Sequence, residues 1–152
     1  MSEVAAAIDF DPPHAEILRL LSASGLPTAD IGTGAVQSFF GLRNPDQGRP
    51  WLGVIGVERH GTEALLRSLA VDPVARNRGI GARLVAAVEA WARTQGCSRV
   101  VLLTTDAQAY FGELGYWAVA RHTLSKALAG SSQVASLCPT TATVMAKDLE
   151  RP

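Results

Sequence analysis

The sequence lacks several features that would each point to a particular class of protein. It has no excess of one sign of charge, because 14 Lys and Arg residues balance 14 Asp and Glu residues and the formal net charge is +0. Dedicated nucleic-acid binders usually carry a basic excess, so we expect no nucleic-acid partner. No apolar run approaches the ~18 residues that a membrane-spanning helix needs, so we expect no membrane association either.

Cysteine is scarce, and no targeting segment is visible. Cys97 and Cys138 are the two cysteines, and in a reducing compartment both are expected to be thiols. The N-terminal residues MSEVAAAIDFDPP contain acids but no basic start followed by an apolar core. They therefore argue against a signal peptide and make the cytoplasm the expected location. A length of 152 residues suits one domain, over residues 1–152.

The sequence does contain a strand–turn–helix unit over residues 65–95, around which the rest is organised. An apolar, strand-like run from Leu65 to Val71 is interrupted by Asp72-Pro73. A glycine-containing turn, Arg76 to Gly81, then leads into a helix with one apolar face. The residues of that face recur at helical spacing: Leu84, Val85, Val88, Trp91 and Ala92.

This turn and helix are typical of an anion-binding site. Glycines allow backbone N–H groups to point inward, and the helix N-terminus adds partial positive charge. Arg76 and Arg78 beside the turn favour a pyrophosphate. The turn is not a Walker loop, because no Gly-Lys-Ser/Thr follows, and it lacks the first glycine of a dinucleotide fingerprint. A turn whose glycines serve only tight packing remains the alternative.

Periodicity and turn residues predict the other elements. Before the central unit they are a weak strand over residues 4–10, a helix from His14 ended by Gly25, and strands over 36–43 and 51–59, with 26–34 left as a turn or short helix. After it they are a buried strand over 99–105, a short helix over 107–114 ended by Gly115, and strands over 116–122 and 142–149, with 126–138 ambiguous.

Together these elements predict the class of fold. The almost wholly apolar run over 99–105 fits a strand that is parallel to the one before the central helix. The sum is an α/β (α+β) fold with a mixed central sheet of about six or seven strands and about four flanking helices. The sheet is expected to be antiparallel early and late, with a parallel pair in the middle.

Two glutamates lie near the hairpin that precedes the central helix. Symmetric pairing about the loop Arg59-His60-Gly61-Thr62 places Glu58 opposite Glu63. Because alternate residues share a face, Glu58, Glu63, Leu65, Arg67 and Leu69 are expected to point the same way unless a bulge intervenes. Two like charges opposite one another need a cationic or functional compensation, unless they lie at a solvated end of the sheet.

A second motif makes a family resemblance specific. Ala107-x-x-Tyr110-Phe111-x-x-Leu114-Gly115-Tyr116 follows Arg76-x-x-Gly79-x-Gly81 by about thirty residues, with a strand between them. Together the two motifs closely resemble those of the GNAT family of N-acetyltransferases, from the first helix to the last strand. The resemblance implies the GNAT fold, with a splayed parallel pair in the sheet, and acetyl-CoA as co-substrate, without a metal.

The resemblance also implies which residues hold acetyl-CoA. Backbone groups of Leu69 and Val71 would pair with the pantetheine arm, and the N–H of Ala70 or Val71 would polarise the acetyl carbonyl. The thioester would lie where this strand splays from the strand that ends near Thr104. The pyrophosphate would be held by Arg76, Asn77, Arg78, Gly79, Ile80, Gly81 and Ala82, and the second motif would add Ala107, Tyr110 and Phe111.

The sequence departs from the family at two catalytic positions. Phe111 stands where many relatives carry a tyrosine that protonates the departing thiolate, and Leu65 stands where many carry a glutamate. An acceptor ammonium, with a pKa near ~8–10, must still lose a proton before it attacks the thioester. Glu58 is the first candidate for that general base and Glu63 the second.

A closer resemblance suggests the acceptor. The phrases Leu65–Val71 (LLRSLAV), Leu102–Thr105 (LLTT) and Ala135–Ala142 (ASLCPTTA) resemble the arsenic-resistance N-acetyltransferases. One branch acts on arsinothricin, an arsenic-containing glutamate analogue, so the resemblance implies an amino-acid-like acceptor of the arsinothricin or phosphinothricin kind.

Three residues are expected to bind that acceptor. Arg67 could grip the acceptor's carboxylate bidentately, Arg43 is a weaker second clamp, and Ser136 in the tail is a third contact. The alternative for Arg67 is a surface position. Cys138 is expected to pack rather than bind As(III).

Other functions stay open at this stage. The acceptor could be an ordinary amino acid, a polyamine or a protein terminus, although near-neutral charge and an arginine clamp count against polycations. A coenzyme-A-binding sensor without catalysis is the non-enzymatic alternative, favoured by Phe111 and Leu65. Homodimerisation through the late strands is plausible from family habit.

Overall fold

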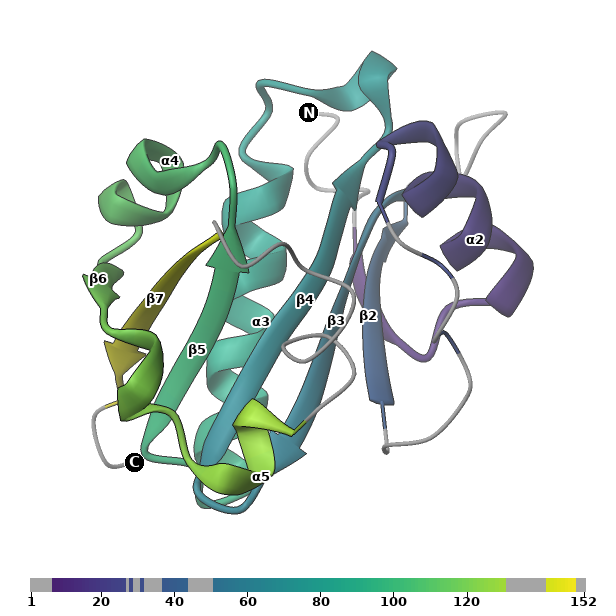
Figure 1. The fold of residues 1–152 in the computed structure, drawn as a ribbon. Coiled ribbons are helices and arrows are strands. Elements are labelled where there is room, and N and C mark those ends of the chain that lie inside the picture. The colour runs from purple at the N-terminus through teal and green to yellow at the C-terminus, as the bar shows by residue number, and fades with distance from the viewer. Residues whose placement is uncertain are drawn as a thin grey trace. The chain divides into compact units, whose positions relative to one another are not determined.

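A computed structural model describes residues 7–26, 28, 31, 37–43, 51–130 and 142–149. Their elements, shown in Figure 1, are β1 (Ala7–Phe10), α2 (His14–Ala23), β2 (Gln37–Arg43), β3 (Trp51–His60), β4 (Glu63–Val71), η1 (Pro73–Ala75), α3 (Ile80–Thr94), β5 (Arg99–Thr104), α4 (Gln108–Glu113), β6 (Trp117–Val119), η2 (Arg121–Thr123), α5 (Lys126–Ala129) and β7 (Thr143–Asp148). The expected strand over 4–10 is described from Ala7 onward, and most of the segment 26–34 lies outside the described residues.

The strands form one seven-stranded sheet in the order β1-β2-β3-β4-β5-β7-β6. β1 pairs antiparallel with β2, β4 pairs parallel with β5, and β7 pairs antiparallel with both β5 and β6. The prediction of a mixed sheet with a parallel pair in its middle is confirmed. No helix in the described ranges is long and apolar enough to cross a membrane.

The chain divides into two compact units, residues 1–57 with 68–88 and residues 58–67 with 89–152. We call them unit 1 and unit 2 and describe each by itself. That the chain forms one domain over 1–152 stays a prediction.

The core of unit 1 forms beneath α2. Ile17, Leu20 and Leu21 lie at helical spacing and are buried, and Gly25, with a φ of 69°, ends the helix region as expected. These side chains pack with residues from the strands in one apolar cluster: Ile17, Leu20, Leu21, Ile31, Phe39, Val54 and Ala70. Burial of this face, rather than intrinsic helix propensity, holds a ten-residue helix in place.

The first turns of α3 approach the sheet of unit 1 closely at Gly53. A Cβ at this position would lie 3.0 Å from Leu84 Cδ1, 3.1 Å from Ile80 Cγ2 and 3.2 Å from the carbonyl oxygen of Ala70. The absence of a side chain therefore lets the start of α3 sit directly on β3 and β4. The glycine fixes where the preceding turn, with its candidate anion-binding groups, is presented.

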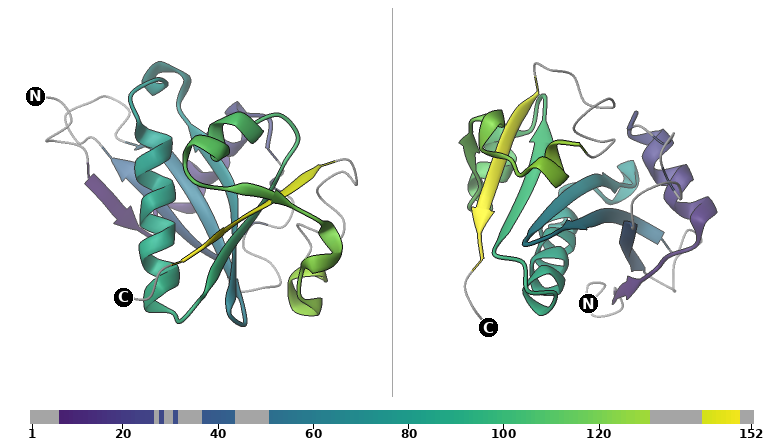
Figure 2. Two further views of the ribbon diagram at one scale, coloured as in Figure 1. Left: turned by 90° about the vertical axis from the view of Figure 1, so that its left-hand side faces the viewer. Right: turned by 60° about the horizontal axis from the view of Figure 1, so that its bottom comes forward.

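Unit 2 is built on β5 and β7, which pair over six residues from Arg99–Asp148 to Thr104–Thr143 and lie side by side in Figure 2. Leu65 of β4 enters an apolar cluster with residues of β5, β7 and the α5 region: Val101, Leu124, Leu128, Val144 and Ala146. β4 and β5 are joined in parallel register at Glu63–Arg99, Ala64–Val100 and Leu65–Val101.

The late part of the chain differs from its predicted strands. The strand expected over 116–122 is limited to Trp117–Val119 and is followed by the 3-10 turn η2. The turn forms because the backbone N–H of Thr123 donates to the carbonyl of Ala120 over 3.0 Å, which an extended strand does not allow. The strand predicted over 142–149 forms β7 and lies between β5 and β6.

Candidate functional site

The predicted anion-binding turn has the expected geometry. Arg76, Asn77, Arg78 and Gly79 are all exposed, and Asn77 and Gly79 have positive φ angles of 66° and 72°. α3 begins directly after them, at Ile80. Glycine adopts this backbone conformation without steric cost, and asparagine tolerates it better than most residues.

The start of α3 supplies donors for an anion. The first intrahelical bond runs from the N–H of Arg83 to the carbonyl of Gly79, at 3.2 Å. The N–H groups of Ile80, Gly81 and Ala82 precede it and have no acceptor within the helix. With two exposed arginines beside them, these donors are of the kind that binds a pyrophosphate.

Asp72 fixes the chain just before this turn. Its side chain is almost completely buried; Oδ1 accepts from the N–H of Val74 at 3.1 Å, and Oδ2 accepts from Nη1 of Arg19 at 3.3 Å. Arg19 also donates to Glu16 and to the carbonyl of Trp51, and hydrogen bonding to Glu16 is the largest cause of its raised pKa. Asp72-Pro73 was predicted only as a break after the strand, although an Asp before Pro at the start of a helical turn is a capping signal.

β4 carries a backbone irregularity at Ser68, where φ is 57° in the middle of the strand. A non-glycine residue with positive φ inside a strand is typical of a bulge, which bends the strand and breaks its alternation. Leu69 was expected to share the face of Arg67 unless a bulge intervenes, and the positive φ of Ser68 lies between these two residues. Beyond the bulge, Ala70 is buried in the unit 1 cluster, and Leu69 and Val71 are half-buried.

The second motif forms α4 in unit 2. Thr104 Oγ1 accepts from the N–H of Ala107 at 3.0 Å, which anchors the start of the helix. Phe111 is buried in edge-to-face contact with Tyr110 and Tyr116, with ring centroids 5.2 Å and 5.9 Å away. Tyr110 is exposed, whereas Phe111 is buried.

The first candidate base, Glu58, is completely enclosed in unit 2. Its Oε2 accepts from Nη1 of Arg67 at 2.8 Å, and its Oε1 lies 2.9 Å from Nε2 of His60. Relative side-chain exposure is 1% for Glu58, 0% for Arg67 and 11% for His60. The alternative of a surface position for Arg67 is therefore wrong, and its guanidinium already pairs with a carboxylate of its own chain.

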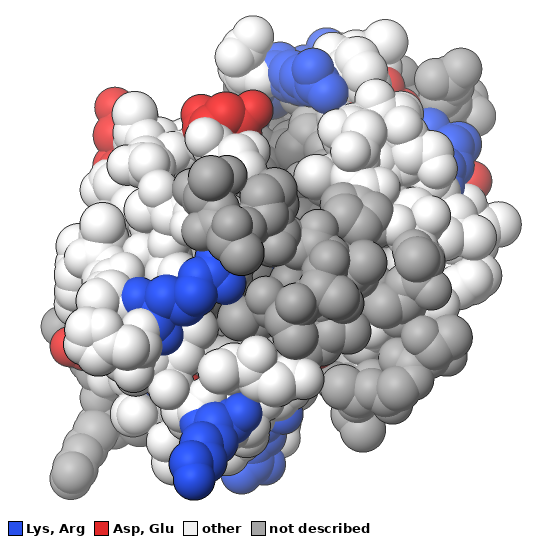
Figure 3. Space-filling view, viewed as in Figure 1, with Lys and Arg blue, Asp and Glu red and all other residues white. Residues whose placement is uncertain are grey.

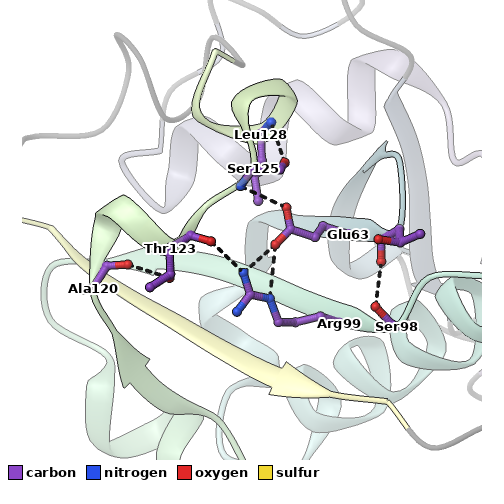
Figure 4. Close-up of polar contacts among 8 residues, drawn as sticks. Glu63, Ser98, Arg99, Ala120, Thr123, Ser125 and Leu128 are labelled. Carbon is purple, nitrogen blue, oxygen red and sulfur yellow. Dashed lines mark hydrogen bonds and ion pairs between the residues drawn. The ribbon is translucent and has the colours of Figure 1, made fainter.

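The second candidate, Glu63, anchors a different part of unit 2. Figure 4 shows its carboxylate between Arg99 and Ser125: Oε2 accepts from Nε and Nη2 of Arg99, and Oε1 accepts from the N–H of Ser125. Burial pushes the pKa of Glu63 upward, but hydrogen bonds from Ser125 and Arg99 and the charge of Arg99 outweigh it and hold the pKa below its usual range. A carboxylate stabilised in this way is a weak proton acceptor.

The hairpin register explains how the two glutamates avoid one another. β3 ends at His60 and β4 begins at Glu63, so Gly61 and Thr62 form the turn. A symmetric hairpin around this turn puts Leu65, not Glu63, opposite Glu58, which corrects the expected register by two residues. The shift keeps the faces unchanged but separates the like charges, and each glutamate has its own arginine.

The remaining acceptor candidates have different environments. Arg43 in unit 1 is partly exposed; its Nε lies 3.0 Å from Asp9 Oδ2, and its guanidinium lies 5.5 Å from the ring centroid of Trp51. The ring of Trp51 in turn covers Gly41, where a Cβ would come within 2.6 Å of it. Ser136 and Cys138 lie outside the described residues.

A further buried polar cluster in unit 2 was not anticipated from the sequence. Tyr116 donates to Glu89 Oε2 at 2.9 Å, and Lys147 Nζ reaches both carboxylate oxygens at 3.2 Å and the carbonyl of Leu114 at 3.0 Å. Burial, followed by the charge and hydrogen bond of Glu89, raises the pKa of Tyr116 far above its ordinary value. These hydrogen bonds connect the end of the second motif to α3 and β7. In the sequence, the only signal for the cluster was the polar Glu89 among the apolar residues of the helix.

The described residues contain one buried cysteine. Cys97 is a buried free thiol whose pKa is raised, mainly by burial, although Arg59 opposes the shift. Within the described ranges, no three His, Cys, Asp or Glu residues gather closely enough to hold a metal ion. On the face seen in Figure 3, basic and acidic side chains form separate small groups.

The described residues combine a mixed sheet with one parallel pair, a positive φ at Ser68 within β4, and an arginine- and glycine-containing turn at the start of α3. The sequence model of the acetyltransferase (GNAT) family matches residues 9–116 of the 152-residue chain. The chain therefore belongs to the acetyltransferase (GNAT) family. This confirms, at the level of the family, the predicted fold, the enzyme class and acetyl-CoA as co-substrate.

Solved structures share the fold at low sequence identity. N-acetylglutamate synthase from Neisseria gonorrhoeae, complexed with coenzyme A and N-acetyl-glutamate, has a TM-score of 0.74 and 19% identity over 95% of this chain. This chain spans 36% of that one, about a third of its length. Rv2747 from Mycobacterium tuberculosis, in complex with CoA and NLQ, has a TM-score of 0.76 and 18% identity over 95% of this chain and 99% of its own. Tetrahymena GCN5 has a TM-score of 0.73 and 15% identity over 96% and 98%. Comparison with curated proteins found no match.

Proposed function

We propose that this protein transfers the acetyl group of acetyl-CoA to the amine of a small, amino-acid-like acceptor. The observation that carries the proposal is the turn before α3, with two exposed arginines, two residues of positive φ and the first N–H groups of a fifteen-residue helix. These groups suit a pyrophosphate, which coenzyme A carries. Membership of the acetyltransferase (GNAT) family supports the same assignment.

The transfer is direct attack of a neutral amine on the thioester, without a covalent enzyme intermediate. The bulge at Ser68 supports a role for the following backbone: Leu69 and Val71 pair with the pantetheine arm, and the N–H of Ala70 or Val71 donates to the acetyl oxygen as negative charge develops there. The thiolate leaves with little help, since an ordinary thiol has a pKa of ~8.5. This suits Phe111, which has no proton to donate.

Of the two candidate bases, Glu58 receives the acceptor's proton in this proposal. Glu63 has a lowered pKa and binds Arg99 and Ser125, which supports a structural role for it. Glu58 is enclosed and has Arg67 on one oxygen and His60 on the other. We propose that the carboxylate of Glu58 lies in the acceptor site.

The acceptor carries a carboxylate that Arg67 recognises. Arg67 is an arginine held at a fixed position on β4 by Glu58, and a planar guanidinium suits a carboxylate. The N-acetylglutamate synthase of similar fold was crystallised with N-acetyl-glutamate, an acetylated amino acid with two carboxylates. Since Arg67 is fully buried, the acceptor must displace atoms that now cover it. Arg43 is a second, more exposed contact and Ser136 a third.

Within this acceptor class, we propose a toxic glutamate analogue of the arsinothricin or phosphinothricin kind. The support is the resemblance of residues 65–71, 102–105 and 135–142 to the arsenic-resistance N-acetyltransferases. An ordinary amino acid is the alternative within the same site.

The test is a thiol-release assay with acetyl-CoA against arsinothricin, phosphinothricin, glutamate, other amino acids and spermidine. Turnover of an arsenic or phosphorus analogue, with a raised acceptor KM in Arg67→Lys, supports the proposal. Arg78→Ala should raise the KM for acetyl-CoA and leave the acceptor KM unchanged. Turnover of spermidine alone would reject the carboxylate-bearing acceptor.

A coenzyme-A-binding sensor is the second candidate function. It is favoured by Phe111, which is buried among aromatic rings, and by Leu65, which lies in the unit 2 cluster instead of presenting a glutamate. Tight binding of acetyl-CoA without thiol release for any acceptor would favour the sensor. A homodimer remains a prediction that sedimentation or light scattering can test.

A further inference from the structure

The exposed turn over residues 76–79 lies between two anchored points of unit 1. After the turn, Ile80 is buried and begins α3, whose first turns pack closely on the sheet at Gly53. Before the turn, Ala75 is buried, and its N–H donates to the carbonyl of Asp72 at 2.8 Å. The first of these anchors is apolar packing, whereas the second depends on where Asp72 lies.

Asp72 is held through both its backbone and its side chain. Its N–H donates to the carbonyl of Leu52 at 2.8 Å, and its Oδ1 accepts from the N–H of Val74 at 3.1 Å, which caps η1. Its Oδ2 accepts from Nη1 of Arg19 at 3.3 Å, and the carboxylate has a relative exposure of only 1%. The direction in which the chain enters η1, and from there the turn, therefore depends on the position of this carboxylate.

Arg19 connects that carboxylate to α2 and to the start of β3. Its Nη2 donates to the carbonyl of Trp51 at 3.1 Å, and Nε and Nη2 donate to Oε1 of Glu16 at 3.1 Å and 2.8 Å. A guanidinium presents its donors in one plane and in fixed directions. The bonds to Trp51 and Glu16 therefore determine where Nη1 of Arg19 meets Asp72.

The turn itself has a backbone conformation that must be maintained by its surroundings. Asn77 and Gly79 both have positive φ angles, and a non-glycine residue such as Asn77 adopts such an angle at some cost in energy. Residues in uncommon backbone conformations persist when the structure on both sides of them holds them there. The anchor at Asp72 supplies one of those two sides.

We propose that Arg19 is a positioning residue for the binding of acetyl-CoA, because through Asp72 it holds the turn over residues 76–79 in the conformation that receives the pyrophosphate. This inference rests on the proposed binding of the pyrophosphate at that turn. Affinity falls in proportion to the fraction of molecules in the competent conformation. A turn that is competent in about one molecule in ten would bind about tenfold more weakly.

The effect is specific to the part of the ligand that the turn receives. Pantetheine is the arm of coenzyme A without the pyrophosphate and the nucleotide. Its expected partners, Leu69 and Val71, belong to β4 and precede Asp72 in the chain. They are held by the pairing of the sheet, so the affinity for pantetheine should not depend on Arg19.

The experiment measures binding to the full chain and needs no acceptor. Calorimetry gives the Kd for coenzyme A, and an NMR titration gives the Kd for pantetheine. Arg19→Met should raise the Kd for coenzyme A by about tenfold and leave that for pantetheine unchanged. Arg19→Lys keeps the charge but not the planar fork, so it should cause a smaller rise, and it carries the same comparison if Arg19→Met does not fold. Arg59→Met, at an exposed arginine of unit 2, is the matched control and should bind coenzyme A as the wild type does.

A second variant tests whether Arg19 acts through Asp72. Asp72→Asn keeps an oxygen that can accept from Val74 but presents an amide in place of the second carboxylate oxygen, so it should also raise the Kd for coenzyme A. If the two residues act through one contact, Arg19→Met/Asp72→Asn should be no weaker than the weaker single variant. A double variant whose loss is the product of the two single losses would reject the route through Asp72.

The remaining outcomes separate this inference from the proposed function. Wild-type affinity for coenzyme A in Arg19→Met, together with weakened binding in Arg78→Ala, rejects the role of Arg19 and leaves the pyrophosphate at the turn. An equal loss of affinity for coenzyme A and pantetheine shows a general disturbance of unit 1 and also rejects that role. Unchanged affinity in both Arg19→Met and Arg78→Ala rejects the inference and the proposed pyrophosphate site together.

Discussion

Unit 2 contains two glutamate–arginine pairs at the same hairpin, and they differ in almost every physical respect. Glu58 and Arg67 have relative side-chain exposures of 1% and 0%, and a histidine completes the cluster. Glu63 and Arg99 have 11% and 22%, and their other partners are backbone groups, the N–H of Ser125 and the carbonyl of Thr123.

The difference shows that the same residue types can serve two purposes a few residues apart. The Glu63–Arg99 pair satisfies backbone groups of the η2–α5 segment, which is a structural task. The Glu58–Arg67 pair is enclosed, so it carries a larger desolvation cost than the partly exposed Glu63–Arg99 pair.

The largest expected effect is a loss of kcat when Glu58 is replaced, compared with little change when Glu63 is replaced. Glu58→Gln should lower kcat by roughly 10²–10⁴-fold, because a general base contributes about that much. Glu63→Gln should leave kcat nearly unchanged. Steady-state kinetics compares kcat for the two variants. Both are measured below their unfolding temperatures, after coenzyme A binding has been verified. Equal losses in the two variants would contradict the assignment of Glu58 as the base.

The next effect concerns stability and separates the two arginines. Arg67→Met removes the permanently charged partner of the buried Glu58 carboxylate and should lower the free energy of unfolding by about 3–5 kcal/mol. Arg99→Met removes a partly exposed pair and should cost only about 1 kcal/mol. Urea denaturation measures both, and the double variant Glu58→Gln/Arg67→Met should recover much of the larger loss. If Arg99→Met cost more than Arg67→Met, the comparison would be reversed.

A smaller effect is the dependence of stability on pH through Glu63. Its pKa in the folded chain is below the ordinary value of 4.5, so the stabilisation from its ionised form is fully present above that value. It is lost as the pH falls through the lowered folded pKa. The stability difference between the wild type and Glu63→Gln should therefore be constant near neutral pH and shrink in acid. A difference that grows as the pH falls would show the opposite shift.

The smallest expected effect concerns the stability of α5 and comes from its N-cap, Ser125. Ser125 Oγ accepts from the N–H of Leu128 at 3.2 Å and caps this short helix. Ser125→Ala should cost about 1 kcal/mol, the usual loss for such a cap, while the bond from its backbone N–H to Glu63 remains. Thermal unfolding of Ser125→Ala beside Ser98→Ala, an exposed serine of unit 2, provides the measurement and its control.

The sequence predicted the fold because its strongest signals were local and consistent. The apolar face of the helix after Gly81, the buried run at 99–104 and the glycine stops at Gly25 and Gly115 all matched the elements of the structure. The end of the hairpin was missed by two residues, since turn length depends on which of several polar residues adopt the turn conformation. The strand predicted over 116–122 was too long, because the hydrogen bonds of the turn at Thr123 override strand propensity after Val119.

The sequence predicted the part of the candidate site that depends on backbone geometry, but not the part that depends on side-chain contacts. The turn from Arg76 to Gly81 follows from glycine spacing, whereas the bulge at Ser68 had no sequence signal beyond a small polar residue in an apolar strand. Side-chain partnerships such as Glu58–Arg67–His60 depend on rotamers and on register. The sequence placed Glu58 and Arg67 on one face but did not predict that they bind one another.

Trp51, held over Gly41 with the guanidinium of Arg43 nearby, also gives the chain an optical probe. It is the one tryptophan of the three that belongs to unit 1, since Trp91 and Trp117 belong to unit 2. Replacement of the latter two by phenylalanine leaves an emission signal that reports on unit 1 alone. Its melting curve, set against the circular dichroism of the whole chain, tells directly whether the two units lose their structure together or in turn.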